Sequence, residues 1–325
     1  MEAVRSMDPV NVILCGAGKM GRHHLRVVRE HAAFRLIAIV DPALAGGSLD
    51  GIPVVASTRE VIGAHAAIIA TPTETHHRVA LEVIDQGLDV LIEKPLATNV
   101  GDCDAIAARA GARGVRVAIG HVERFNPAVR ALENLDLGEV RSVSFVRIGG
   151  SRRCDVLHEL AVHDLDLLER IAGRASLRSA ITRSSCNDAV IDGAELDLVT
   201  ERGAEAFVEL NAFGERVRRV RIETRHDTAE LDLLAPSLTY RGERVALHHE
   251  EPLRAQLTAF RAFLAGHPSD VCRIDEATRS VELADEARHR IARPQRLGQV
   301  SGTSLLRREI PCPLSTTAPR SRRPR

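Results

Sequence analysis

The feature that most constrains the fold is the stretch VNVILCGAGKMG, in which a short apolar run leads directly into a glycine loop. Gly16, Gly18 and Gly21 have the spacing G-x-G-x-x-G, and the following LRVVREH is typical of a helix. A second apolar run, FRLIAIVD, ends in Asp41, 20 residues beyond Gly21. Strand, glycine turn, helix, strand and acid in this order predict a parallel βαβ unit that binds a dinucleotide.

The loop residues have distinct expected roles. Gly16 allows a tight turn, Gly18 lets the backbone approach a pyrophosphate, and Gly21 lets the helix pack closely on the strand. The pyrophosphate would lie at the helix N-terminus, where free N–H groups and the helix dipole favour an anion. The cofactor-binding residues predicted here are Gly16, Ala17, Gly18, Lys19, Met20 and Gly21.

Asp41 also bears on the choice of cofactor. A carboxylate at this position accepts the adenosine ribose hydroxyls and repels the 2′-phosphate of NADP. The following residues, PALAGG, contain no arginine that could bind that phosphate. The sequence therefore favours NAD, with NADP as the alternative.

Strands and helices continue to alternate up to His121. The apolar runs AHAAIIATPT, DVLIEKP and VRVAIGH are separated by the helical patterns HHRVALEVIDQG and VGDCDAIAARAGARG. This alternation predicts a doubly wound parallel sheet with helices on both faces. Ligands bind outside the carboxyl ends of such strands. We therefore expect Thr71, Pro72, Glu93 and Lys94, which end two of the runs, to face the cofactor.

The pattern changes in the second half of the chain. Between residues 178 and 247 the apolar and polar residues mostly alternate, as in AELDLVTERG, VRRVRIETR and AELDLLA. Period two is typical of strands with one solvated face, so the sequence predicts a large, mostly antiparallel sheet. We expect an α/β protein with a Rossmann domain at 1–121, a substrate-binding and oligomerisation domain at 122–300, and a disordered basic tail at 301–325.

The stretch DVLHELAVHDLDLLERIAG, from Asp155 to Gly173, concentrates histidines and acids in a predicted helix. His158 and His163 are five residues apart and diverge on an α-helix, so they cannot hold one metal ion. Glu159 and His163 are four apart and share a face, which suits a proton-transfer pair. An exposed salt pair is the alternative. No metal site is expected.

Composition excludes several classes of function. Lys+Arg and Asp+Glu are both 44, so the net charge gives no sign of nucleic acid as a partner. No apolar run approaches the roughly 20 residues that span a bilayer, and the start, MEAVRSMDPV, lacks a signal-peptide core. The six cysteines are scattered without a C-x-x-C pair, so we expect a reduced, cytoplasmic protein.

From Val10 to Ile291 the chain resembles the Gfo/Idh/MocA oxidoreductases, which include glucose–fructose oxidoreductase and inositol dehydrogenase. The resemblance rests on five motifs in order: GAGKMG, ATPTETH, EKPLA, GHVERFNP and ELAVHDLD. It implies a Rossmann domain followed by an α/β domain with a broad antiparallel sheet. It also implies hydride transfer between a nicotinamide cofactor and a secondary hydroxyl or ketone of a sugar, amino sugar, nucleotide sugar or cyclitol.

The resemblance assigns roles to individual residues. Lys94 matches the family's EKP lysine, and His163 matches its acid/base histidine. Glu159 stands where aspartate is common, and would orient the imidazole or bind a substrate hydroxyl. His76 falls in the T-P-x-x-x-H position near the cofactor. The substrate-binding residues predicted are Lys94, Arg124, Asn126, Glu159 and His163.

The motif GHVERFNPAV is most similar to the UDP-N-acetylglucosamine 3-dehydrogenase subgroup of the family. An alternative of another class is a non-catalytic NAD-binding redox sensor or regulatory subunit, for which Glu in place of Asp at position 159 is the support. We also expect a homodimer or homotetramer, because sheets of the predicted kind often associate face to face.

Overall fold

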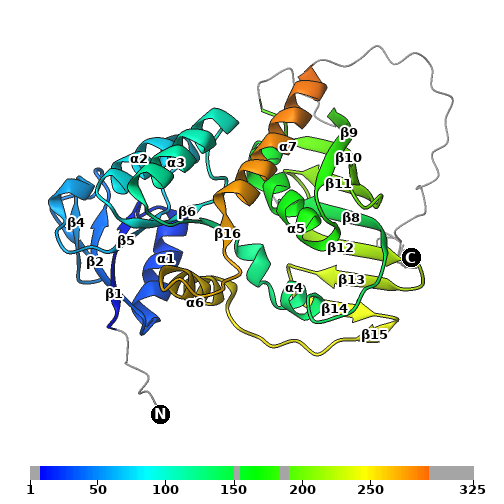
Figure 1. Cartoon of the computed structure of the whole chain (residues 1–325), viewed down its shortest axis with the longest axis horizontal. Helices are drawn as coiled ribbons and strands as arrows, with labels where there is room; N and C mark the ends of the chain where they lie inside the picture. Colours follow the sequence, from blue (N-terminus) through cyan, green and yellow to red (C-terminus); the bar gives the residue numbers. More distant parts are fainter. Residues whose placement is uncertain (1–7, 150–153, 183–189, 293–325) are drawn as a thin grey trace, which may run out of the picture. The chain divides into compact units, whose positions relative to one another are not determined.

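The computed structural model describes residues 8–149, 154–182 and 190–292. Their strands form two sheets, drawn in Figure 1 in blue to cyan, apart from the orange edge strand β16, and in green to yellow. The predicted basic tail lies outside the described residues. None of the helices in these ranges combines the length and the apolar character that crossing a bilayer requires.

The first sheet has the strand order β16-β7-β6-β5-β1-β2-β4-β3. The strands that carry the predicted cofactor residues pair in parallel, whereas β3 and β16 pair antiparallel at the two edges. Their bounds are β1 Val10–Cys15, β2 Phe34–Val40, β3 Ser48–Leu49, β4 Ile52–Val55, β5 Ala66–Ile69, β6 Asp89–Glu93, β7 Val117–Gly120 and β16 Cys272–Arg273.

Both faces of this sheet are covered by helices, as the apolar runs predict. On one face, side chains of α2 (His76–Asp85), α3 (Val100–Arg113) and α7 (Ile274–Ala292) pack in a buried apolar cluster. On the other, α1 (Lys19–Glu30) and α6 (Pro252–Leu264) close a second cluster. Because β1 is buried from Val12 to Cys15, a ligand can meet this strand only through the glycine loop that follows its carboxyl end.

The second sheet has the order β15-β14-β13-β12-β8-β11-β10-β9 and is antiparallel except between β8 and β11. The predicted fold class is therefore confirmed. Its strands are β8 Val140–Ile148, β9 Ala175–Thr182, β10 Gly193–Thr200, β11 Glu205–Asn211, β12 Val217–Thr224, β13 Thr228–Asp232, β14 Ser237–Tyr240 and β15 Glu243–Arg244.

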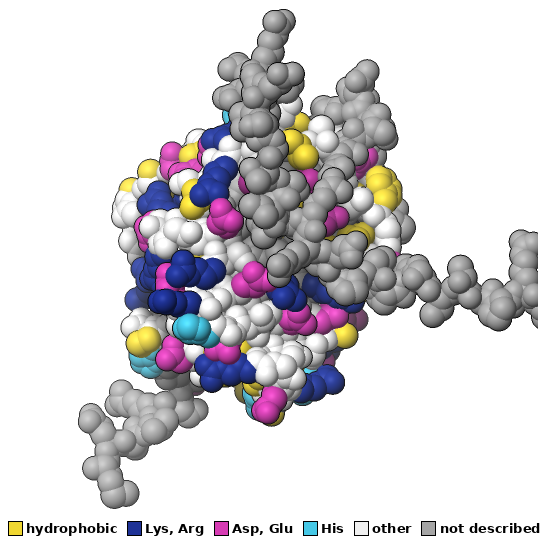
Figure 2. All heavy atoms as spheres, turned by 90° about the vertical axis from the view of Figure 1, so that its right-hand side faces the viewer, with side chains coloured by type: hydrophobic (Ala, Val, Ile, Leu, Met, Phe, Trp, Pro, Cys, Tyr) yellow, Lys and Arg dark blue, Asp and Glu magenta, His cyan; other side chains and the backbone are white. Residues whose placement is uncertain are grey.

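One face of the second sheet packs on α4 (Pro127–Leu132), α5 (Val162–Ala172) and α7 through a large apolar cluster. Leu210 of β11 belongs to this core, at 2% exposure, whereas Phe207 has the opposite parity. In the view of Figure 2, basic and acidic side chains are interspersed and apolar ones are scattered. The oligomer stays a prediction.

The segment from α6 to β16 returns from the second half of the sequence to the first sheet. Leu253, Leu257 and Phe260 of α6 pack in the same apolar cluster as β1, and Phe260 stacks on Phe34 with ring centroids 6.2 Å apart. Cys272 pairs with Ile119 of β7. A division of the chain at residue 121 alone therefore leaves out part of the first sheet's covering.

Candidate active site

The glycine loop between β1 and α1 has the geometry that its spacing predicts. Gly16 has φ +93°, and a Cβ there would lie 2.7 Å from the carbonyl oxygen of Ala70. A Cβ on Gly21 would lie 2.0 Å from the carbonyl oxygen of Gly16. Gly18, by contrast, has no atom within 4 Å of where its Cβ would be, and it caps α1 without a side-chain hydrogen bond. The loop leaves an open cradle in front of free helix N–H groups, which fits a pyrophosphate.

Asp41 follows β2 and lies against the same loop. Its Oδ2 accepts a hydrogen bond from the backbone N–H of Ala17 at 2.9 Å, and its Oδ1 accepts one from Ala43 at 3.1 Å. The carboxylate is half-buried beside the turn, which is the position expected for a group that binds the adenosine ribose.

His76 connects the ends of two neighbouring strands. The ring is buried, with Nε2 3.0 Å from the carbonyl oxygen of Thr71 after β5 and Nδ1 2.9 Å from that of Pro95 after β6. Thr71 also accepts a hydrogen bond from the hydroxyl of Thr75 at 2.8 Å. These contacts hold the two strand ends, and with them Pro72, at the edge where parallel sheets bind ligands.

The side chain of Glu93, the last residue of β6, is directed into the protein. Its Oε1 lies 2.6 Å from Nε2 of His24 on α1, and both side chains are buried. A Cβ on Gly120 would lie 3.1 Å from this carboxylate, so the glycine makes room for it. Burial opposes ionisation of Glu93, but the hydrogen bond and charge of His24 lower its pKa overall.

Lys94 connects the first sheet with the second half of the chain. Its Nζ donates a hydrogen bond to the backbone carbonyl of Glu159 at 2.9 Å. Burial lowers the pKa of Lys94, the carboxylates of Glu93 and Glu159 oppose the shift, and the charge of Arg147 adds to it. An ammonium group carries three N–H donors, so two remain for a ligand after this contact.

The helix expected from Asp155 to Gly173 begins differently from an ordinary α-helix. Leu157–Ala161 forms a π turn, and α5 starts at Val162. Such turns often occur at functional sites because they redirect the side chains around them. His158 lies against α7, with Nε2 3.1 Å from Asp285, whereas His163 packs on His121 with ring centroids 5.9 Å apart. The two histidines thus contact different parts of the protein: His158 contacts α7 and His163 contacts His121.

His163 lies in a positively charged environment. Burial lowers its pKa well below the ordinary histidine value, and the charges of Lys94 and Arg147 lower it further. The imidazole is therefore neutral at neutral pH and able to accept a proton. Its Nδ1 is buried without a hydrogen-bond partner in the described part of the chain. The geometry leaves Nε2 as the nitrogen that can meet a substrate.

The carboxylate of Glu159 was expected to hold the imidazole of His163. The backbone carbonyl of Glu159 accepts the hydrogen bond from Nζ of Lys94 and so orients the lysine. Nδ1 of His163 makes no hydrogen bond within the described residues, to Glu159 or to any other group. The orienting role of the carboxylate stays a prediction.

Buried arginines pair with the acidic residues that follow His163 on α5. Arg147 of β8 forms hydrogen bonds to Asp164 at 2.7 and 2.9 Å and to Glu123 at 3.1 Å, and all three side chains are at most 6% exposed. Burial opposes the charge of Arg147, but the two carboxylates raise its pKa overall. Since Asp164 adjoins His163, the pair anchors the start of α5 to the second sheet.

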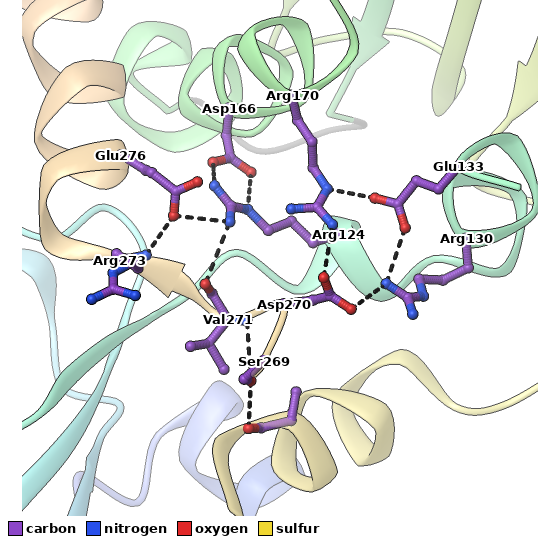
Figure 3. Close-up of polar contacts among 11 residues, drawn as sticks. Arg124, Arg130, Glu133, Asp166, Arg170, Ser269, Asp270, Val271, Arg273 and Glu276 are labelled. Atoms are coloured by element: carbon purple, nitrogen blue, oxygen red, sulfur yellow. Dashed lines mark hydrogen bonds and ion pairs between the residues drawn. The ribbon is translucent and has the colours of Figure 1, made fainter. Parts of the chain in front are cut away.

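Arg124 makes a similar contact with α5 (Figure 3). It donates to both carboxylate oxygens of Asp166, at 2.5 and 2.9 Å, and also to Glu276 and to the carbonyl of Val271. Beside it, Arg130, Glu133, Arg170 and Asp270 form a closed ring of ion pairs between 2.5 and 3.2 Å. The network ties the segment before β16 to α4 and α5. Asp164 and Asp166 are thus both held in buried ion pairs.

The environment of Arg124 and Asn126 differs from the expected contact with substrate. Arg124 is 2% exposed and Asn126 is 4% exposed. The amide of Asn126 donates to Glu123 at 3.2 Å and to the carbonyl of Leu233 at 2.9 Å, and its oxygen caps α4. These internal contacts favour a positioning role for both residues over a direct contact.

One group of described residues has the chemistry of a metal site. His121, Asp166 and Cys272 place one ligand atom each within 4.8 Å of the others, and all three are buried. Arg124 already occupies both oxygens of Asp166, and burial raises the pKa of the Cys272 thiol well above its usual value. A cation would have to displace a guanidinium and deprotonate this thiol, so the donor set does not fit one.

Sequence reasoning missed His121, Glu123, Arg147 and Arg218. The first two lie within GHVERFNP, where their type could have drawn attention. The two arginines left a clearer signal. Arg147 shares the core-facing parity of Val143 and Phe145, and Arg218 shares that of Val220 and Ile222. A charged residue at a core-facing strand position predicts a buried partner.

Comparisons with known proteins agree with this geometry. A family model described as "Oxidoreductase family, NAD-binding Rossmann fold" matches residues 10–121. Inositol 2-dehydrogenase 1 of Saccharopolyspora erythraea is 30% identical over 289 residues, which cover 77% of this chain and 85% of that protein. UDP-N-acetylglucosamine 3-dehydrogenase of Acidithiobacillus ferrooxidans is 29% identical over 250 residues, covering 68% and 79%. The solved structure of the latter superposes with a TM-score of 0.80 at 25% identity, covering 88% of this chain and 98% of that one.

Proposed function

The chain belongs to the Gfo/Idh/MocA family of NAD-binding oxidoreductases, and on that premise we propose that it is a dehydrogenase acting on a secondary hydroxyl of a sugar or cyclitol. The reverse reaction, reduction of the ketone, uses the same groups. The observation that carries the proposal is the convergence of Lys94 and His163. Lys94 ends a strand at the nucleotide edge and bonds to the turn that precedes the helix of His163.

In the proposed reaction, neutral His163 removes the hydroxyl proton through Nε2. Lys94 donates a hydrogen bond to the same oxygen and stabilises the negative charge that develops there. The lowered pKa of Lys94 makes its ammonium a better donor for this purpose. A nicotinamide cofactor, held by the glycine loop and the strand ends, would supply the acceptor for the hydride that leaves the carbon. In the reduction, protonated His163 returns the proton to the oxygen, while Lys94 keeps its hydrogen bond to that oxygen and its own charge.

We further propose that NAD is preferred to NADP. The support is Asp41, whose carboxylate lies against the glycine loop through its bond to Ala17. The carboxylate repels the 2′-phosphate of NADP, and the residues that follow Asp41 contain no arginine that could bind this phosphate. In the same proposal, Gly18 and the start of α1 bind the pyrophosphate, while Thr71, Pro72 and His76 shape the nicotinamide side.

The direct test is the absorbance of the reduced cofactor when the protein is mixed with NAD or NADP and a panel of sugars. The panel should contain myo-inositol, N-acetylglucosamine and UDP-N-acetylglucosamine, since relatives with names of both kinds match this chain. We expect reduction with at least one of them. Tight NAD binding without turnover on any sugar, cyclitol or corresponding ketone would favour the non-catalytic sensor instead.

A further inference from the structure

We propose that Arg218 binds an anionic group of the substrate, a phosphate or a carboxylate, so that the enzyme prefers a sugar that carries such a group to a neutral sugar or cyclitol. This inference rests on the proposed function and assigns the substrate class of the same site. Its basis is an arginine whose charge is only partly balanced within the protein and which lies within electrostatic reach of the reaction centre.

Arg218 lies on β12, directly opposite Arg147 on β8. Two like charges facing each other across neighbouring strands destabilise a sheet unless a counter-ion separates them. Glu123 fills that role with a single oxygen, since its Oε1 accepts from Arg147 at 3.1 Å and from Arg218 at 2.9 Å. Arg147 has Asp164 as a second carboxylate partner. Within the described residues, the one carboxylate that accepts a hydrogen bond from Arg218 is that of Glu123.

The guanidinium of Arg218 has donors to spare. Only Nη1 is engaged, while Nε and Nη2 make no hydrogen bond to the part of the chain that the structure describes. The side chain is 34% exposed, compared with 2% for Arg147. An arginine carries five N–H donors in a planar fork. The fork is thus held at one corner by Glu123 and is open to a ligand along another edge.

Contacts link this fork to the helix of His163: Glu123 bonds to both Arg218 and Arg147, and Arg147 pairs with Asp164, the neighbour of His163. Burial lowers the pKa of Lys94 and of His163, and the charge of Arg218 adds to the shift in each. Burial lowers the pKa of Arg218 itself, Glu123 opposes the shift, and Arg147 and Arg216 add to it. An additional negative charge beside Arg218 would favour the protonated form of all three groups.

A phosphate suits the fork best. Guanidinium and phosphate form paired, charge-assisted hydrogen bonds with defined geometry. A carboxylate, as in a uronic acid, offers the same chemistry with less charge. The ligand class is therefore a sugar with an anionic substituent, either phosphate or carboxylate, and the two sources can be distinguished experimentally.

The experiment is calorimetric titration of the NAD-saturated protein, which reports binding whether or not turnover follows. The probes share one sugar ring: N-acetylglucosamine 1-phosphate and the neutral methyl glycoside of N-acetylglucosamine. We expect the phosphate to bind about 10- to 100-fold more tightly, the size of a charge-assisted hydrogen bond or two. Glucuronic acid against methyl glucoside tests the carboxylate in the same way, and UDP-N-acetylglucosamine tests the diphosphate.

Arg218→Gln should remove the preference for the anionic probe and leave the neutral probe and NAD unchanged. Arg218→Lys should retain part of it, because a point charge replaces the fork. The matched control is Arg219→Gln, which changes the adjacent arginine on the opposite, exposed face of β12. It should behave as wild type. The melting temperature of each variant checks that the protein still folds when the contact with Glu123 is changed.

Equal affinity of the wild type for the anionic and neutral probes would overturn the proposal. So would a preference that survives in Arg218→Gln, or one that Arg219→Gln abolishes equally. Failure of the proposed function has a different signature: no sugar, charged or neutral, would then reduce NAD or NADP, whatever binds in the titration.

Discussion

Two regions of the candidate site differ in the interactions that build them. One is the nucleotide edge, where the strands of the first sheet end; the other, called the wall here, is the set of ion pairs between α5, β8, β12 and the segment before α4. The edge relies on backbone: glycines that open a cradle, free helix N–H groups and strand ends held by His76. The wall relies on buried charge: Arg147 with Asp164 and Glu123, Arg124 with Asp166, and Arg218 alongside.

The difference suits what each region has to do. A pyrophosphate can be bound by backbone dipoles, which a short local motif supplies. A proton acceptor at neutral pH needs its pKa set by surrounding charge and burial, and those come from distant parts of the chain. Substitutions at the edge should therefore alter cofactor binding, whereas substitutions in the wall should alter kcat or the free energy of unfolding.

The largest effect is expected from the two reacting groups. His163→Ala should lower kcat about 10²- to 10⁴-fold, and Lys94→Ala about 10²- to 10³-fold, with little change in NAD affinity by fluorescence titration. The matched control is His158→Ala, since His158 faces Asp285 on α7 and should be dispensable for chemistry. If His163→Ala retains more than half of wild-type kcat while a deuterium isotope effect shows hydride transfer to be rate-limiting, the assignment is wrong.

The second effect concerns stability. Arg147→Met leaves Asp164 and Glu123 buried without their main counter-charge, so the free energy of unfolding should fall by about 3 to 5 kcal/mol. Urea denaturation measures it. Arg219→Met, an exposed arginine of the same sheet, should change it by less than about 0.5 kcal/mol. Similar losses in the two variants would mean that the buried network contributes no more than surface charge does.

The third effect tests the edge. Asp41→Ala removes the carboxylate proposed to bind the adenosine ribose, so kcat/KM with NAD should fall roughly tenfold relative to NADP. The Michaelis constant for the sugar should stay unchanged, because Asp41 contacts the glycine loop and not the wall. A wild-type enzyme that prefers NADP tenfold would contradict the proposed cofactor preference.

The fourth effect is a shift in pH dependence. Oxidation requires neutral His163, so kcat/KM falls as the pH drops through its pKa. Because that pKa is lowered, the acid limb should lie below the ordinary histidine value of about 6.5. Arg218→Gln removes one of the positive charges responsible and should move the limb to higher pH. A limb at or above the ordinary value in the wild type would show that the wall does not act on His163 as described.

The smallest effect is expected at Glu159. Glu159→Gln keeps the backbone carbonyl that orients Lys94, so kcat should fall by less than about tenfold, below the range of a general base. Glu159→Asp should cost least, because aspartate is the residue that the family commonly has. A loss as large as that of His163→Ala would restore the carboxylate to the centre of proton transfer.

Much of the edge was predictable because its determinants are close in sequence. Gly16, Gly18, Gly21 and Asp41 have the environments that their spacing implies. The wall was predictable only in part. His163 was predicted from the family resemblance, and its role stays a proposal. The internal contacts of Arg124 and Asn126 were not predicted, because their partners Asp166, Glu276 and Leu233 lie 42, 152 and 107 residues away in sequence.

The sequence by itself determined the two sheets and the glycine cradle, because periodicity and short motifs encode local geometry, and its resemblance to the family pointed to Lys94 and His163. Tertiary structure decided which charges surround them. The π turn at Leu157–Ala161, the carbonyl of Glu159 that orients Lys94, and the Arg147–Arg218 pair across β8 and β12 all arise from register and packing. The physical reason is that pKa and charge balance depend on distance in space, which residue spacing along the chain does not fix.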